Sequence, residues 1–359
     1  MKTKFKTMKF FLGSSSPKGF YSKFESLIDP EDNWYCRILK GSPGCGKSHL
    51  LKRIADAGVK NNVFTEYIYC SADPDSLDAV IFPELKSCIV DGTAPHTLDP
   101  VYPGAVEHII NLGDFWDGAL LKNSREGIIA SNNANTALHA TAKKYLAAYG
   151  AINSDTIEDV INKIDFEKVK SYAHDFIKKM FENVPEKSEI GVEYSRFISA
   201  ISLDGILFYQ ENLENFENIY EIKDKYGIIG DLLLKFLRNS ALSYGLKITT
   251  CFSPLTLNER IECILIPELS VALIVTGGFF ELSEELASQE INTDIFYIDK
   301  KEPQENEFNK LTSQSLVKKA SEIMKKAKEI HDDLENYYIK AMNFKAIDKV
   351  TEQIISEIF

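Results

Sequence analysis

Residues 41–48, Gly-Ser-Pro-Gly-Cys-Gly-Lys-Ser, constrain the fold of this chain more than any other segment. They follow an apolar run at residues 35–40, which predicts a β-strand, and they precede a run at residues 48–57 with helical spacing of its apolar residues. Glycines at positions 41, 44 and 46 let the backbone turn so tightly that successive N–H groups face one anion. The sequence therefore predicts an anion-binding turn between a strand and a helix.

The same segment matches the pattern G-x-x-x-x-G-K-[ST] and resembles the phosphate-binding loop of P-loop NTPases. The resemblance implies that Lys47 reaches the β- and γ-phosphates, and that the Ser48 hydroxyl ligates Mg²⁺. It also implies that the following helix directs its positive N-terminus at the phosphates. We therefore expect ATP or GTP with Mg²⁺ as cofactors. The expected binding residues are Gly41, Ser42, Pro43, Gly44, Cys45, Gly46, Lys47, Ser48 and His49.

A second predicted strand, residues 87–91, ends on Asp91, where a Walker B acid would hold Mg²⁺. We expect Lys47 and Asp91 to be catalytic, and Ser48 and Asp91 to ligate the metal. The alternative is that Asp91 only caps the next turn. No Glu follows Asp91, whereas many mechanical ATPases use one there to activate water, so the sequence leaves hydrolysis open.

Further polar residues follow two of the predicted strands. The strand at residues 66–70 leads into three carboxylates, Asp73, Asp75 and Asp78, which could orient an acceptor or hold a second ion. Alternatively, Asp73 caps a short helix. His96 lies just beyond Asp91 and is either a sensor of the γ-phosphate or an ordinary loop histidine.

Residues 197–275 repeat the pattern of residues 11–91, with patchy identity but matching spacing. Residues 224–231 of the second copy correspond to residues 41–48, and there Asp224, Gly230 and Asp231 replace the first glycine, the lysine and the magnesium-binding hydroxyl. Two carboxylates would repel a phosphate. We therefore predict that the second copy folds similarly and binds no nucleotide.

The alternation of strands and helices predicts an α/β fold with two tandem P-loop NTPase-like, mostly parallel sheets, covered by helices and carrying helical extensions. The expected domains are residues 1–184, with the intact loop, and residues 192–359, with the degenerate loop and the C-terminal helices. We expect a turn between two helices at residues 153–155. We expect a solvated helical hairpin at residues 311–359, with a partner-binding coiled coil as the alternative.

Composition narrows the classes of partner and compartment. The net charge of −12 argues against a general nucleic-acid or membrane-surface binder, although Lys2, Lys4, Lys6 and Lys9 leave a basic arm as a minor alternative. The six cysteines contain no C-x-x-C pair, and no apolar stretch is long enough for a signal peptide or a membrane span. We expect a cytoplasmic protein, with no zinc at the scattered histidines.

Residues 40–48, 70–78, 82–85 and 91–96 together resemble a family of bacterial tandem P-loop ATP-binding proteins, most of which have no assigned physiological role. The leading hypothesis is a slow, Mg²⁺-dependent nucleoside-triphosphatase with a catalytically inactive second repeat. One alternative is a kinase that transfers the γ-phosphoryl group to a small molecule. Another is a nucleotide-dependent switch that binds a protein partner. The sequence leaves open the acceptor, the partner, the choice between ATP and GTP, and the oligomeric state.

Overall fold

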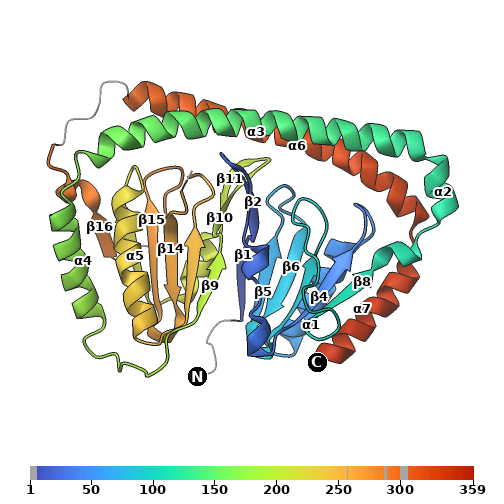
Figure 1. Cartoon of the computed structure of the whole chain (residues 1–359), viewed down its shortest axis with the longest axis horizontal. Helices are drawn as coiled ribbons and strands as arrows, with labels where there is room; N and C mark the ends of the chain where they lie inside the picture. Colours follow the sequence, from blue (N-terminus) through green and yellow to red (C-terminus); the bar gives the residue numbers. More distant parts are fainter. Residues whose placement is uncertain (1–5, 257, 287–288, 300–305) are drawn as a thin grey trace.

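The computed structural model describes residues 6–256, 258–286, 289–299 and 306–359. The chain forms two six-stranded sheets covered by helices, and two long helices lie across both sheets (Figure 1). This arrangement confirms the α/β class. Lys2 and Lys4 of the basic N-terminal arm lie outside the described residues.

The two sheets have the same strand order. The first sheet runs β1 (Thr7–Phe10), β5 (Thr65–Tyr69), β6 (Leu77–Phe82), β7 (Ser87–Asp91), β4 (Tyr35–Lys40) and β8 (Glu107–Asn111). The second runs β9 (Glu193–Arg196), β13 (Ile248–Phe252), β14 (Ile261–Ile266), β15 (Val271–Thr276), β12 (Asn218–Lys223) and β16 (Gln289–Asn292). Each half also has a hairpin, β2 (Gly13–Ser16) with β3 (Gly19–Ser22) and β10 (Ser199–Ser202) with β11 (Gly205–Phe208). The second copy therefore folds like the first, as its sequence predicted.

Both sheets are mixed, because β6 and β14 run antiparallel to their neighbours while the other pairings are parallel. The reason is the length of the connections. Residues 70–76 and 83–86 are too few for the crossover that a parallel pairing requires. Strands β6 and β8 were not among the predicted elements, and His108 lies in β8.

The two halves share one hydrophobic core. Edge strands β1 and β9 approach each other, and the backbones of Phe11 and Phe197 exchange two hydrogen bonds of 2.9 Å just beyond them. A single buried cluster contains Phe10 and Ile38 of the first half together with Leu265 of the second. The halves are therefore parts of one packed unit.

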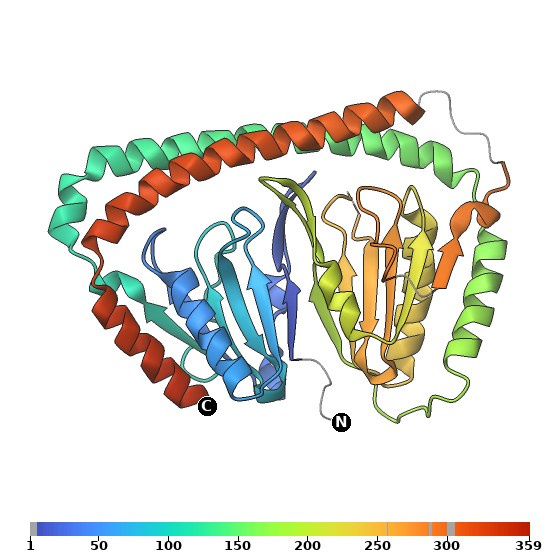
Figure 2. The same cartoon turned by 180° about the vertical axis from the view of Figure 1, so that it is seen from behind.

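Each half of the chain contributes a helix that packs on the other half. The principal helices are α1 (Lys47–Lys60), α2 (Gly118–Asn123), α3 (Arg125–Ile161), α4 (Phe166–Met180), α5 (Ile228–Ser243), α6 (Asn306–Ala341) and α7 (Phe344–Ile358). Short 3₁₀ segments are η1 (Phe24–Ser26), η2 (Pro30–Asp32), η3 (Pro83–Leu85), η4 (Leu112–Phe115), η5 (Gln210–Asn215), η6 (Pro267–Leu269) and η7 (Thr293–Phe296). Helix α3 crosses to the second half, where α4 packs on α5, and α6 crosses back, so that α7 packs on α1 (Figure 2).

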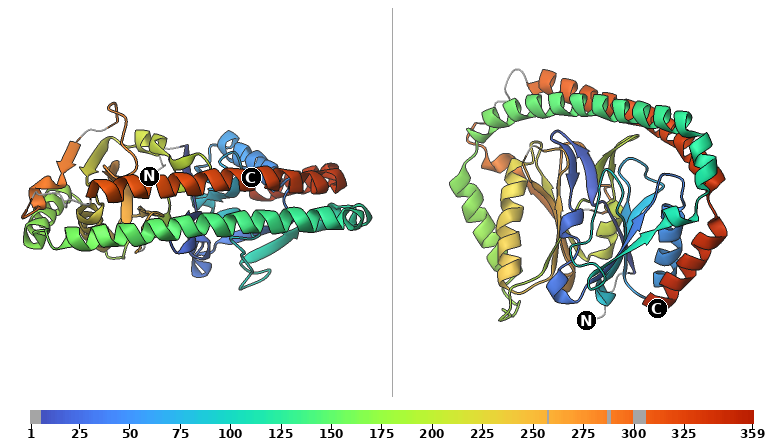
Figure 3. Two further views of the ribbon diagram at one scale, coloured as in Figure 1. Left: turned by 90° about the horizontal axis from the view of Figure 1, so that it is seen from above. Right: turned by 45° about the vertical axis from the view of Figure 1, so that its right-hand side comes forward.

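Two expectations about the helices are wrong. No turn interrupts α3 at residues 153–155, and the helix ends only at Ile161. The tail is not a solvated hairpin, because α6 packs along α3 and α7 packs on α1 (Figure 3). In both cases long-range packing outweighs local turn signals. Among the described residues, no helix is both long enough and apolar enough to cross a membrane.

Candidate functional site

The glycine loop, residues 41–48, connects the carboxyl end of β4 to the start of α1. Gly44 and Gly46 have φ values of 74° and 89°, which side chains rarely adopt. A side chain at Gly41 would also come within 2.6 Å of the Cys45 sulfur. The backbone therefore favours glycine at positions 44 and 46, and the packing of the Cys45 side chain disfavours a larger residue at position 41.

Lys47 and Asp91 meet beside this loop. Strand β7 pairs in parallel with β4, so Asp91 ends its strand at the edge of the sheet from which the loop leaves. The Lys47 ammonium donates hydrogen bonds of 2.9 Å to the carbonyls of both Gly41 and Ser42, and it lies 3.6 Å from Asp91 Oδ2. Both side chains are largely buried. A lysine ammonium and an aspartate carboxylate therefore lie together at the start of α1.

Ser48 and Asp91 are the residues expected to ligate Mg²⁺, and each accepts hydrogen bonds from the protein itself. Ser48 Oγ accepts a hydrogen bond of 3.0 Å from the Leu77 N–H, and Asp91 Oδ1 accepts from the Thr93 N–H at 3.0 Å and hydroxyl at 2.6 Å. The alternative role of Asp91 as a turn cap is thus also present. No group of three or more His, Cys, Asp or Glu side chains suited to a metal occurs in the described part of the chain. Two protein oxygens fit Mg²⁺, which usually keeps phosphate and water ligands.

Asp78 and His96 form a buried pair next to these residues. His96 Nε2 lies 4.0 Å from Asp78 Oδ1, and the imidazole stacks on Phe24 with ring centroids 4.5 Å apart. Burial raises the pKa of Asp78 to about 6, the negative charge of Asp91 acts in the same direction, and His96 opposes both. Asp78 was expected after the end of a strand, whereas it lies inside β6. The only sign of this position in the sequence is that Asp78 is the one acidic residue in the apolar segment Leu77–Phe82.

The three predicted acidic residues do not form one cluster. Asp73 accepts a hydrogen bond of 2.7 Å from the Ser76 hydroxyl and lies 3.4 Å from the Lys328 ammonium of α6. Asp75 is exposed, and Asp78 is buried in β6. Asp73 begins a turn and not the short helix that was the alternative. The three carboxylates therefore do not surround one position at which an acceptor could bind.

The remaining loop residues lie as follows. Cys45 is buried, and burial raises the pKa of its thiol while Lys47 opposes this shift, so the thiol is not activated. Ser42 and Pro43 are partly exposed, and His49 is exposed in the first turn of α1. Of the nine expected binding residues, His49 is thus on the exposed face of the helix.

In the second half, a carboxylate occupies the corresponding loop. Gly227, at φ 65°, is the counterpart of Gly44, and α5 starts directly after it. Asp224 is buried and accepts hydrogen bonds from the N–H groups of Gly230 at 2.8 Å and Tyr226 at 3.1 Å. Asp231 accepts from the Ile261 N–H at 2.9 Å, as Ser48 does from Leu77. The amides that would bind a phosphate are thus already bonded to the protein's own side chain.

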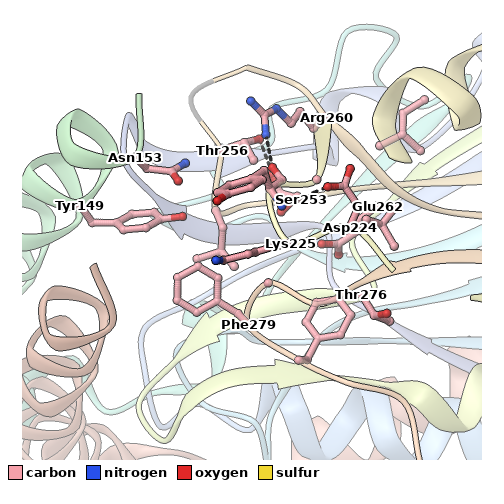
Figure 4. Close-up of a pocket in the computed structure, with 17 residues that line it drawn as sticks. Tyr149, Asn153, Asp224, Lys225, Ser253, Thr256, Arg260, Glu262, Thr276 and Phe279 are labelled. Carbon is pink, nitrogen blue, oxygen red and sulfur yellow. Dashed lines mark hydrogen bonds between the residues drawn. The ribbon is translucent and has the colours of Figure 1, made fainter. Parts of the chain in front are cut away.

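A cavity of about 120 Å³ remains beside this second loop (Figure 4). Asp224, Arg260 and Glu262 line one side, and Tyr149 of α3 faces them from the other. Arg260 donates a hydrogen bond of 2.8 Å to the Tyr226 carbonyl. Glu262 occupies the position in β14 that Asp78 occupies in β6, and burial raises its pKa to about 7. A buried carboxyl group therefore lies at the second residue of the corresponding strand in both halves.

The raised pKa of Glu262 predicts a pH-dependent stability. Because the folded-state pKa of about 7 exceeds the ordinary 4.5, the folded protein retains this proton more tightly, and its stabilising contribution is lost as the pH rises from about 4.5 to 7. Glu262→Gln mimics the protonated form. We expect the variant to be about 2–3 kcal/mol more stable than the wild type at pH 8, with the difference vanishing near pH 4.5. Urea unfolding at both pH values measures this.

The control for this measurement is Glu284→Gln, at an exposed position of the same half. It should leave the pH dependence of unfolding unchanged. A Glu262→Gln variant that is less stable than the wild type at pH 8 would show that the buried carboxylate is stabilising when charged.

These residues define a class of site: a loop rich in N–H groups between a parallel strand and a helix, with a lysine and a strand-end aspartate beside it. Such a site suits a polyphosphate with a divalent cation. Comparisons with protein-family models, with curated proteins and with solved structures gave no match to this chain. The functional assignment therefore depends on the geometry described above.

Proposed function

We propose that the first half binds a nucleoside triphosphate with Mg²⁺ in the glycine loop, and that the chain hydrolyses it slowly. The observation that supports this most is the position of Lys47. Its ammonium lies over the loop carbonyls of Gly41 and Ser42, next to Asp91, where it can reach a terminal phosphate. The strand, the loop, the lysine and the strand-end acid follow one another as a phosphate-binding loop would require, and this supports the proposal.

Each group has a distinct role in this proposal. The loop N–H groups and the N-terminus of α1 bind the phosphates, and Lys47 contacts the β- and γ-phosphoryl oxygens. Ser48 and Asp91 would hold Mg²⁺, which neutralises charge on the phosphates. The first half would thus serve as a P-loop domain, and the chain would resemble the bacterial tandem P-loop ATP-binding proteins.

Slow turnover is expected because no Glu follows Asp91 to activate water. In hydrolysis, a water oxygen bonds to the γ-phosphorus, the bond from that phosphorus to the β–γ bridging oxygen breaks, and a proton leaves the water. Asp78 is a titratable group that interacts with both Lys47 and Asp91. With a pKa of about 6, Asp78 is ionised at pH 7 and can accept that proton. We expect fewer than ~10 turnovers per second.

Asp91→Asn tests the metal-dependent part of this proposal. Loss of the carboxylate should lower Mg²⁺-dependent phosphate release by about tenfold or more. In EDTA, ATP affinity should stay the same or rise, because the variant removes a negative charge beside the phosphates. Phosphate release and calorimetry, each with and without EDTA, measure the two effects.

Asp75→Asn is the matched control, because Asp75 is exposed near the same end of the sheet. It should leave both quantities unchanged. If Asp91→Asn also leaves them unchanged, Asp91 is only a turn residue. Acceleration of phosphate transfer by a pool of nucleosides and sugars, lost in Asp75→Asn, would instead support the kinase alternative.

A nucleotide-dependent switch is the second candidate function. The observation that favours it is the contact between α6, a helix that begins in the second half, and the glycine loop of the first half. A nucleotide bound in the loop would act on a helix that spans the molecule. Turnover then matters less than which nucleotide is bound.

A further inference from the structure

Helix α6 lies against the glycine loop at Glu335. A Cβ atom added to Gly44 would be 2.6 Å from the Glu335 carbonyl oxygen and 3.0 Å from its Cα. The next helix continues this contact, since a Cβ at Gly46 would be 3.4 Å from the Phe344 ring. The loop is therefore covered by helices from the C-terminal part of the chain.

The Glu335 carboxylate interacts with its own helix and with the loop. It lies 3.5 Å from His331 Nε2, one helical turn earlier. The hydrogen bond from His331 lowers the pKa of Glu335, burial opposes it, and the positive charge of Lys328 and the N–H of Gly44 add to the lowering. The carboxylate is thus ionised at neutral pH and is held near a loop N–H that a phosphate would use.

Two negative groups cannot occupy that position together. A phosphate and the Glu335 carboxylate would compete for the Gly44 N–H and repel each other. The second half shows the permanent form of this occupation, where Asp224 accepts from the N–H groups of its own loop. Glu335 differs because it belongs to α6 and not to the loop itself.

We propose that Glu335 is an autoinhibitory residue that occupies the glycine loop in the absence of nucleotide and is displaced by the triphosphate. This inference rests on the proposed function, because it assigns regulation to the same site. Displacement would move α6 at the loop. Helix α6 packs along α3, and α3 carries Tyr149 into the cavity of the second half, so the two loops are connected through one helix pair.

Two variants test the proposal. Glu335→Gln removes the charge, and Glu335→Ala removes the carboxyl group. Glu329→Gln, at an exposed position of the same helix, is the control. We expect both Glu335 variants to bind ATP about three- to tenfold more tightly than the wild type and the control, without loss of phosphate release. In the nucleotide-free protein, Glu335→Ala should also increase hydrogen exchange at the amides of residues 41–48.

Several outcomes would contradict this role. Unchanged affinity with an at least about tenfold loss of turnover would make Glu335 the activator of water. Unchanged hydrogen exchange in nucleotide-free Glu335→Ala would overturn the contact itself, whether or not ATP binds. If no protein binds ATP, the proposed function and the displacement both fail, while a rise in exchange would still show that Glu335 protects the loop.

Discussion

Lys47→Ala is expected to lower the affinity for ATP by about ten- to a hundredfold, because it removes a charge-assisted contact to the phosphates from a largely buried position. The carbonyls of Gly41 and Ser42, which now accept from the ammonium, would lose that donor as well. Calorimetric titration with Mg²⁺–ATP measures the change.

Lys52→Ala is the matched control, since Lys52 is exposed on the same helix. It should bind ATP like the wild type. If Lys47→Ala also retains full affinity, the nucleotide does not bind in the glycine loop, and the assignment of the first half is wrong.

The largest expected effect on stability comes from the ion pair between the halves. Arg196 of β9 is fully buried, and its Nε and Nη2 atoms lie 2.9 and 2.8 Å from Glu66 Oε2 of β5. Arg196→Leu leaves the Glu66 carboxylate buried without its partner. We expect a loss of about 3–5 kcal/mol in the free energy of unfolding. Urea unfolding followed by circular dichroism measures it.

The double variant Arg196→Leu with Glu66→Leu should recover most of this loss, because it removes both charges from the core. Arg238→Leu is the comparison at a partly exposed pair, where Arg238 contacts Glu193, and it should lose no more than about 1 kcal/mol. Equal losses for Arg196→Leu and Arg238→Leu would show that the pair between the halves is not shielded from water.

The residues around the glycine loop could be predicted because their signals are local. Strands β4 and β7 occupy the residues expected from their apolar runs, and α1 begins at Lys47, one residue before the expected start. The expected end of this helix at residue 57 was wrong, because α1 continues to Lys60. Gly58 lies inside α1, where a Cβ would be 2.3 Å from the Phe82 ring, so this glycine permits close packing and does not end the helix.

The parts that could not be predicted depend on contacts between distant segments. Nothing near Glu335 in the sequence indicates that it lies over Gly44. The exchange of helices between the halves likewise has no local signal, because α6 and α7 have ordinary amphipathic patterns that fit several partners. The repeat did predict that Asp224 would oppose phosphate binding, but its hydrogen bonds to the loop amides required the structure.

The central claim is that the first loop binds nucleotide and the second does not. Equilibrium dialysis of the full chain with labelled ATP and Mg²⁺ tests it most directly, with Lys47→Ala dialysed in parallel. We expect one nucleotide per chain in the wild type, and little or none in the variant at the same ATP concentration. Two nucleotides per chain, or one that persists undiminished in Lys47→Ala, would contradict it, as would no binding by the wild type.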